Sequence, residues 1–312
     1  MIKGLFAGTS PFTQLIMLAF CMVMCFLLFL LIGILLAPFV LGIPVAELMN
    51  ALNSDAVDQH LNLMRYFQVL QGIGFFIVPA FFAAYLFSGT LDSSTKITDT
   101  DYLSLRQTAP SKSFGAVLLL MLSAIPCINL LATLNEMIVF KGSLSGLEQH
   151  LRNLEENARQ LIELFINVDH AGGMFFNIFM IAILPALGEE LIFRGILQKI
   201  IARWTGNIHV AIIITGFLFS LMHRQFYEFF PIWLLGIVFG YLLIWSGTIW
   251  LPIFAHFVNN TFTVCVSYLI HKGIISKKIE VFGSAWHDFP ITIVALVVCV
   301  WLLWKIFKNR IS

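Results

Sequence analysis

Long apolar runs separated by short polar connectors form the main pattern of this chain. A helix of about 20 residues crosses the hydrocarbon core of a bilayer, which is roughly 30 Å thick. Backbone groups in lipid must be paired within their own segment, so each apolar run predicts a transmembrane helix. The pattern therefore predicts an all-α, polytopic membrane protein, a bundle of about eight transmembrane helices. The expected spans are roughly 13–38, 66–88, 114–137, 174–198, 207–223, 230–246, 248–270 and 289–307.

One connector, 144–166, has a different pattern. Apolar residues recur in it at steps of three or four positions, and they are Leu147, Leu151, Leu154, Ala158 and Leu161. Set among charged residues, this spacing predicts an amphipathic helix that lies on the membrane surface or on the bundle. A contact between two copies of the chain is the alternative. No repeat and no second domain is visible in the sequence, so we expect one membrane domain over 1–312.

Composition agrees with a membrane protein. Hydrophobic residues make up 59% of the chain and charged residues 11%, whereas soluble domains carry about 25% charged residues. The net charge of +1 gives no basic field for a nucleic-acid partner. The five cysteines lie in apolar stretches without CxxC spacing, so we expect them to be buried hydrophobic residues rather than disulfides or metal ligands.

Charge only weakly specifies the orientation in the membrane. Lys and Arg residues divide almost evenly between the two sets of connectors, so the positive-inside rule does not decide. The basic cluster of Lys305, Lys308 and Arg310 favours both termini on the cytoplasmic side. We expect a multi-pass protein of the plasma membrane.

The fourth span contains two adjacent glutamates. Glu189 and Glu190 point about 100° apart on a helix, so they have different roles. Arg194 lies four residues after Glu190, shares its face and is expected to pair with it. Glu189 has no such local partner, and a lone carboxylate at membrane depth is a candidate general base. The alternative is a structural salt bridge beside one solvated glutamate.

Two histidines and an asparagine lie on later spans. His223 ends the fifth span and shares a face with Phe219, although a histidine there could equally be an interfacial or capping residue. His256 and Asn260 are four residues apart and project from one face of the apolar seventh span. Two hydrogen-bonding side chains in such a helix need partners or a function, and a polar contact between helices is the alternative. Asn259 faces elsewhere and is predicted to be such a contact.

Together these groups provide the parts of a hydrolytic site. A water activated by Glu189, with help from His223, would attack a peptide carbonyl. His256 and Asn260 would stabilise the oxyanion that forms. Because water is the nucleophile, the reaction requires neither serine nor cysteine.

Three motifs in this order resemble those of the CPBP family of intramembrane glutamic endopeptidases, also called the Abi or CAAX prenyl protease type II family. The matching residues are Glu189, Glu190 and Arg194 for EExxxR, Phe219 and His223 for FxxxH, and His256 and Asn260 for HxxxN. The resemblance covers roughly 175–265, which would be the catalytic core, and it implies an eight-helix bundle.

The resemblance also implies roles and substrates. Glu189 and His223 would activate the water, and His256 and Asn260 would form the oxyanion hole. Glu190 and Arg194 would be structural. Eukaryotic members remove the last three residues of prenylated CAAX proteins, and bacterial relatives are linked to bacteriocin maturation, self-immunity or membrane scaffolding. The expected partners are membrane lipids and a peptide or lipid-anchored protein substrate.

Two alternatives and one geometric problem stand beside this interpretation. Glu189, His223 and His256 could instead bind a catalytic zinc ion, although we prefer a site without a cofactor. The polar cavity could also belong to a catalytically silent scaffold or to a transporter. A fifth span that crosses the bilayer straight would place His223 near the membrane face, whereas Glu189 lies partway along its helix. A deep, funnel-shaped cavity or an extended fourth helix would reconcile the two.

Overall fold

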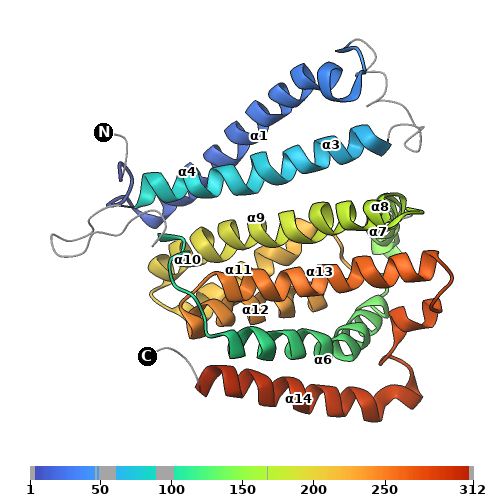
Figure 1. Ribbon diagram of the computed structural model, residues 1–312. Coiled ribbons are helices and arrows are strands. Elements are labelled where there is room, and N and C mark those ends of the chain that lie inside the picture. The colour runs from blue at the N-terminus through green and yellow to red at the C-terminus, as the bar shows by residue number, and fades with distance from the viewer. Residues whose placement is uncertain (1–3, 46–47, 49–60, 89–101, 167, 309–312) are drawn as a thin grey trace.

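The computed structural model describes residues 4–45, 48, 61–88, 102–166 and 168–308. Within these ranges the chain is helical and has no strand. Seven of the described helices are long and apolar enough to cross a membrane. This finding confirms a polytopic, all-α membrane protein, whose bundle is shown in Figure 1.

The helices and their bounds, with π- and 3₁₀-helical segments labelled η, are the following. They are α1 Pro11–Leu41, α3 Leu61–Gln71, η2 Gly72–Ile77, α4 Val78–Phe87, α6 Ser111–Glu136, η3 Gly142–Leu144, α7 Ser145–Ile166, α8 Ala171–Asn177, η4 Ile178–Ile183, α9 Leu184–Ile192, η5 Phe193–Leu197, α10 Gln198–Thr205, α11 Ile208–His223, α12 Phe229–Ser246, α13 Trp250–His271, η6 Lys277–Val281, η7 Trp286–Asp288 and α14 Phe289–Lys308.

The first two spans form a pair at one side of the bundle (Figure 1). α1 starts after the N-cap Ser10, whose hydroxyl accepts the N–H of Thr13, and it stops at Gly42, where φ is 70°. It contacts the second span, made of α3, η2 and α4. Large apolar side chains on its outer face, such as Phe20 and Leu31, remain exposed. Such a surface is stable when its solvent is lipid rather than water.

The fourth span is one long helix interrupted by two π-helical segments. It runs over 35 residues, Ala171–Thr205, and consists of α8, η4, α9, η5 and α10. At a rise of 1.5 Å per residue it is about 50 Å long, longer than the bilayer core. The π segments η4 and η5 lie directly before and after α9. π-helical segments of this kind occur often at functional sites, and here they flank the two glutamates.

The fifth expected span, 207–223, corresponds to α11, which is short for a full crossing of the bilayer. α11 has 16 residues, which give a length of about 24 Å, less than the roughly 30 Å of a bilayer core. It is the one shorter apolar helix found among the described residues. Its C-cap, Arg224, has a positive φ of 57°, and the chain then turns back into α12. His223 therefore lies at the end of a short apolar helix, directly before the turn into α12.

Two glycines bring α11 and α12 into close contact. A Cβ atom added to Gly236 would lie 2.9 Å from the Cα atom of Gly216, a distance that no side chain permits. The same helices are joined by a hydrogen bond from Trp233 Nε1 to the carbonyl oxygen of Ile213, at 3.0 Å. Close approach through small residues is a common way to pack helices in membranes. It brings the backbone of α12 within reach of the fourth span.

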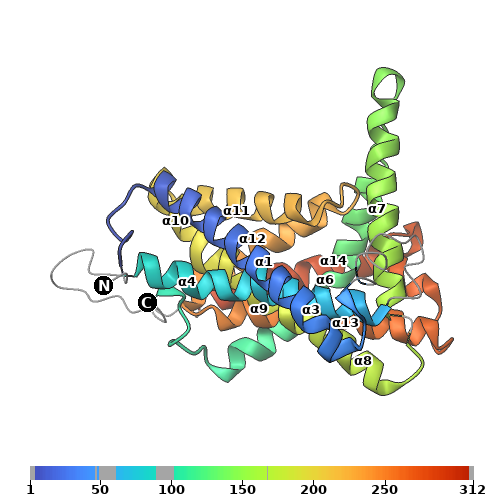
Figure 2. The ribbon, with the colours of Figure 1, turned by 90° about the horizontal axis from the view of Figure 1, so that it is seen from above.

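The amphipathic connector forms the helix α7, Ser145–Ile166, as predicted. Figure 2 shows α7 almost perpendicular to the spans at one end of the bundle, and extending past its edge. Its contacts hold it on the bundle: Glu155 accepts the N–H of Tyr227 at 2.9 Å, and the Phe165 carbonyl accepts from Asn177 Nδ2 at 2.7 Å. The start of α1 and the end of α14 lie at the opposite end (Figure 1).

Two apolar clusters pack on either side of the candidate residues. One joins α1, α4, α9, α10 and α11 and includes Leu191 and Phe219. The other joins α6, α12, α13 and α14 and includes Phe239 and Ala255. The rings of Phe219 and Phe239 both contact the ring of His256. The polar residues therefore lie between the two clusters, which hold them away from lipid.

Candidate active site

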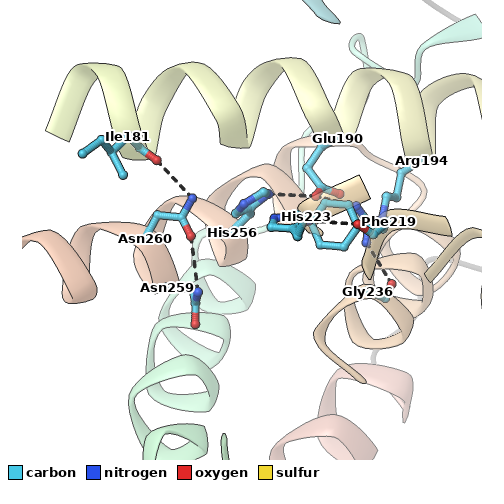
Figure 3. Close-up of polar contacts among 9 residues, drawn as sticks. All are labelled: Ile181, Glu190, Arg194, Phe219, His223, Gly236, His256, Asn259 and Asn260. Carbon is cyan, nitrogen blue, oxygen red and sulfur yellow. Dashed lines mark hydrogen bonds and ion pairs between the residues drawn. The ribbon is translucent and has the colours of Figure 1, made fainter. Parts of the chain in front are cut away.

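Glu190 is the centre of a buried polar network. Its Oε1 atom accepts a hydrogen bond from Arg194 Nη1 at 2.7 Å and lies 3.0 Å from Nδ1 of His256. The side chains of Glu190 and Arg194 are fully buried, and that of His256 is 4% exposed. Because an ionised carboxylate only accepts hydrogen bonds, His256 donates from Nδ1. This contact joins the first motif, on α9 and η5, to the third motif, on α13 (Figure 3).

Arg194 uses backbone and aromatic partners as well. Its Nη2 atom donates to the Gly236 carbonyl at 3.0 Å, which α12 presents where it packs closely on α11. The guanidinium carbon lies 4.4 Å from the centre of the Phe219 ring and 5.3 Å from that of Phe239. Aromatic faces attract a desolvated cation by about 2 kcal/mol or more. These contacts, together with Glu190, offset the cost of burying the arginine charge.

Two aromatic rings fix the plane of the His256 imidazole. Phe239 stacks on it with ring centres 5.4 Å apart and an angle of 22°. Phe219 meets it edge to face at 5.7 Å and 87°. The hydrogen bond to Glu190 fixes the remaining rotation. His256 therefore presents Nε2 in one direction, as second-sphere contacts do for functional histidines elsewhere.

His223 is brought to the same place by α11. Its Nδ1 atom lies 2.9 Å from the carbonyl oxygen of Phe219, one helical turn earlier. A carbonyl only accepts, so Nδ1 carries the proton of the neutral ring, and Nε2 is left as an acceptor. The ring also contacts the Phe219 ring, at 4.6 Å. Phe219 thus touches His223, His256 and Arg194, so the second motif lies against the other two.

Glu189 is half-buried. Its Oε2 atom is fully enclosed and has no hydrogen-bond partner within the described residues, and the same holds for Oε2 of Glu190. Glu189 also interacts electrostatically with His256, Glu190 and Arg194. Buried polar atoms without a partner are rare in folded proteins. These two carboxylate oxygens are therefore acceptors of the network that are left without a protein partner.

Asn260 lies one turn beyond His256 on α13. Its Nδ2 atom donates to the carbonyl of Ile181 at 3.1 Å, and its Oδ1 atom accepts from Asn259 Nδ2 at 3.3 Å. Asn260 thus faces the fourth span, as His256 does. Within the described residues, no group of three or more His, Cys, Asp or Glu side chains is arranged to hold a metal ion.

The loop that follows His223 is held by Asn135 of α6, in addition to the contact of Tyr227 with α7. Asn135 of α6 donates from Nδ2 to the carbonyl of Phe226 and accepts the N–H of Phe230, both at 3.0 Å. Glu228 ends this loop. Burial, together with the nearby Glu155 and Glu136, raises the pKa of its carboxyl to about 7. The loop is therefore sensitive to the charge of Glu228.

The structure adds contacts that sequence spacing did not reveal. Glu190 was expected to pair with Arg194 alone, yet it also binds His256. Asn259 was expected to contact a different helix, but its amide contacts Asn260. Gly236, through its carbonyl, is a further member of the network. A signal for it was present in the sequence, because Gly236 and Gly240 are spaced by four on α12 and their carbonyls accept from Arg194 and Gln198.

Part of the chain is similar to known membrane proteases. Residues 171–262 match a family model described as type II CAAX prenyl endopeptidase Rce1-like. The chain is 29% identical over 118 residues to the membrane-embedded CAAX protease MroQ of Staphylococcus aureus (strain USA300), covering 36% of this chain and 47% of MroQ. It is 31% identical over 91 residues to the sporulation-killing factor biosynthesis protein SkfC of Bacillus subtilis (strain 168), covering 27% of this chain and 18% of SkfC.

These matches span less than half the length of either relative. No solved structure is significantly similar to the chain. The matched region contains all three motifs, from Glu189 to Asn260. Residues 171–262, which carry all three motifs, are therefore similar to the Rce1-like family of type II CAAX prenyl endopeptidases.

Proposed function

We propose that this protein is an intramembrane endopeptidase that hydrolyses a peptide bond of a membrane-associated peptide. The observation that carries the proposal is the setting of Glu189. Its enclosed Oε2 atom has no internal hydrogen-bond partner, and it lies beside Glu190, which is bonded to His256. A carboxylate in such a setting is suited to bind and deprotonate a water molecule.

In the proposed reaction, Glu189 takes a proton from a water molecule as its oxygen attacks the carbonyl carbon of the substrate. The lone pair on Nε2 of His223 accepts a hydrogen bond from the same water and orients it. The carbon–nitrogen bond of the tetrahedral intermediate then breaks. The proton held by Glu189 passes to the leaving nitrogen, which gives one free carboxylate and one free amine.

His256 and Asn260 are proposed to stabilise the oxyanion. His256 already uses Nδ1–H for Glu190, so it donates from Nε2 only when both ring nitrogens carry protons. The Glu190 carboxylate stabilises that cation. Asn260 has two amide hydrogens, and the Ile181 carbonyl uses one of them. Donors fixed in advance toward a developing charge contribute about 100- to 1,000-fold to the rate.

The proposed substrate is a peptide or lipid-anchored protein held at the membrane, of the kind processed at a CAAX box. The family assignment of residues 171–262 supports this class. The name of MroQ, a membrane-embedded CAAX protease, agrees with it. Membrane lipids surround the bundle, since the outer faces of the spans are apolar and exposed.

We further propose a plasma-membrane location with both termini in the cytoplasm. The start of α1 and the end of α14 lie at the same end of the bundle (Figure 1). Lys305 and Lys308 lie in the last turns of α14, and basic residues favour the cytoplasmic side.

Cleavage by the purified full chain in lipid nanodiscs tests the proposal. The substrates are a peptide that ends in a farnesylated CAAX box and the same peptide without the farnesyl group, and products are identified by mass spectrometry. We expect a single cut near the modified cysteine by the wild type, and a rate at least 100-fold lower for Glu189→Gln and for His223→Ala. Glu163→Gln, on the exposed face of α7, is the control and should cut normally.

The alternatives predict other results. A catalytically silent scaffold or self-immunity protein would cut neither peptide, whichever residue stands at position 189. If the catalytic site lies elsewhere, the Glu189→Gln variant would cut the peptide as fast as the wild type. Either result would contradict the proposal. Equal cleavage of both peptides would support a protease that does not require a prenyl group on its substrate.

A further inference from the structure

Asn259 and Asn260 form a pair of side-chain amides on α13. Asn259 Nδ2 lies 3.3 Å from Asn260 Oδ1, and Asn260 Nδ2 lies 3.1 Å from the carbonyl oxygen of Ile181. Figure 3 shows the three groups in a line, with Asn260 in the middle. Asn259 therefore touches Asn260 and not the other candidate residues of the close-up.

The acceptor on the fourth span fixes the orientation of the Asn260 amide. A backbone carbonyl can only accept, so the amide face toward Ile181 must be the NH₂ group. The oxygen of Asn260 then faces Asn259, which must present its own NH₂ group. The two contacts agree on one orientation of each amide.

Pro185 explains why the Ile181 carbonyl is available. In an α-helix the carbonyl of Ile181 would accept the N–H of the residue four positions later, and proline has no N–H. The π-helical segment η4 ends just before this proline, and the N–H of Leu184 bonds five residues back, to Phe179. The fourth span thus offers an acceptor at the depth of Asn260.

The orientation has a consequence for catalysis. With its NH₂ group held on the site side, Asn260 keeps a second hydrogen for an oxyanion. Rotation of the amide by half a turn would present its oxygen instead, and two negative oxygens would repel each other. Asn259 opposes that rotation, because its NH₂ group would then face the NH₂ group of Asn260.

We propose that Asn259 is a positioning residue that holds the Asn260 amide with its hydrogens toward the oxyanion. This inference rests on the proposed function, in which Asn260 is an oxyanion donor. Asn259 itself does not touch the substrate. Its effect passes through one hydrogen bond to the neighbouring amide.

Three variants in the peptide-cleavage assay test this role. Asn259→Ala removes the donor, and we expect kcat to fall about 3- to 10-fold with KM unchanged, since a single net hydrogen bond is lost. Aspartate at position 259 has nearly the same shape as asparagine but offers an acceptor. At neutral pH, kcat of Asn259→Asp should therefore be lower than kcat of Asn259→Ala. As pH decreases and the carboxyl gains a proton it becomes a donor, and its activity relative to wild type should recover.

The decisive comparison is made in the Asn260→Ala background. If Asn259 acts through Asn260, then Asn259→Ala should cause no further loss there. Asn129→Ala, on α6 and bonded to the Phe282 carbonyl, is the control and should leave cleavage unchanged in both backgrounds. Thermal unfolding of each variant shows whether it is folded.

Two results would overturn the inference. Equal losses from Asn259→Ala in both backgrounds, or an Asn259→Asp variant as active as wild type at neutral pH, would show that Asn259 does not act through Asn260. A normal rate of peptide cleavage by Asn260→Ala would show that Asn260 is not an oxyanion donor, which contradicts the role proposed for this residue. The first pair of results leaves the protease in place, so the two failures are distinguishable.

Discussion

His256 Nδ1 lies 3.0 Å from Oε1 of Glu190, the atom that also binds Arg194. One carboxylate oxygen thus links two helices that are far apart in the sequence. It gives Glu190 a second contact besides Arg194, because the same oxygen also orients the ring of His256. In the proposed reaction, Glu190 therefore supports both the packing of the helices and the orientation of His256.

Glu190→Gln should lower both stability and activity. It leaves Arg194 without a counter-charge in an enclosed site, and loss of one partner of a buried ion pair typically costs about 3–5 kcal/mol. It also removes the stabilisation of protonated His256, so we expect cleavage to fall by at least about 10-fold. Thermal unfolding in detergent and peptide cleavage measure the two effects. A fully stable and active variant would show that the ion pair is dispensable.

A double variant separates the two effects. Glu190→Gln combined with Arg194→Met removes both charges, and replacement of a whole buried pair is often nearly neutral for stability. We expect it to recover most of the melting temperature lost in Glu190→Gln. Activity should remain low, because His256 still lacks its carboxylate. Recovery of activity along with stability would indicate that Glu190 is purely structural.

The close contact of α11 and α12 predicts that Gly236→Ala is destabilising. The new Cβ atom would meet the backbone of Gly216, which cannot move aside as a flexible side chain can. Overpacking of this kind costs about 1–3 kcal/mol. Gly115→Ala is the matched control, since a Cβ atom there meets nothing within 4 Å and alanine is a better helix former by about 1 kcal/mol. Equal melting temperatures for the two variants would contradict the packing described above.

The loop after His223 should make stability depend on pH. Burial raises the pKa of Glu228 from 4.5 to about 7, so the folded protein holds this proton more tightly than the unfolded chain. The stabilisation from this group is present below pH 4.5 and is lost as pH rises to about 7. Glu228→Gln should therefore flatten the dependence of melting temperature on pH in this interval. Parallel curves for wild type and variant would show that Glu228 titrates normally.

Activity is expected to survive a strong chelator. The proposed reaction uses a carboxylate, two imidazoles and an amide, with no metal-bound water. Cleavage is measured after dialysis against 1,10-phenanthroline, with a known zinc protease treated in parallel. Loss of activity that added zinc restores would favour the alternative in which Glu189, His223 and His256 are ligands.

Much of the fold was predictable because apolar length and helical period leave few choices in a membrane. The spans and the amphipathic α7 follow from these patterns, and so does the shared face of Glu190 and Arg194. So does the end of α11 at His223, which agrees with the expected span 207–223.

The contacts between helices could not be predicted from the sequence. Periodicity shows which residues share a face, but it does not show which helix that face meets or at which height. The pairing of Glu190 with His256 depends on the packing of α13 on α9. The contact of Asn259 with Asn260 depends in turn on the carbonyl that Pro185 leaves available on the fourth span.

The central claim is that Glu189 and His223 activate one water molecule as a unit. Its most direct test is the rate of peptide cleavage by Glu189→Gln, His223→Ala and the double variant, each in nanodiscs and each shown to be folded by thermal unfolding. Residues that act together give losses that do not add, so we predict at least a 100-fold loss for each single variant and no greater loss for the double. Wild-type rates in either single variant, or losses that multiply in the double, would contradict the account.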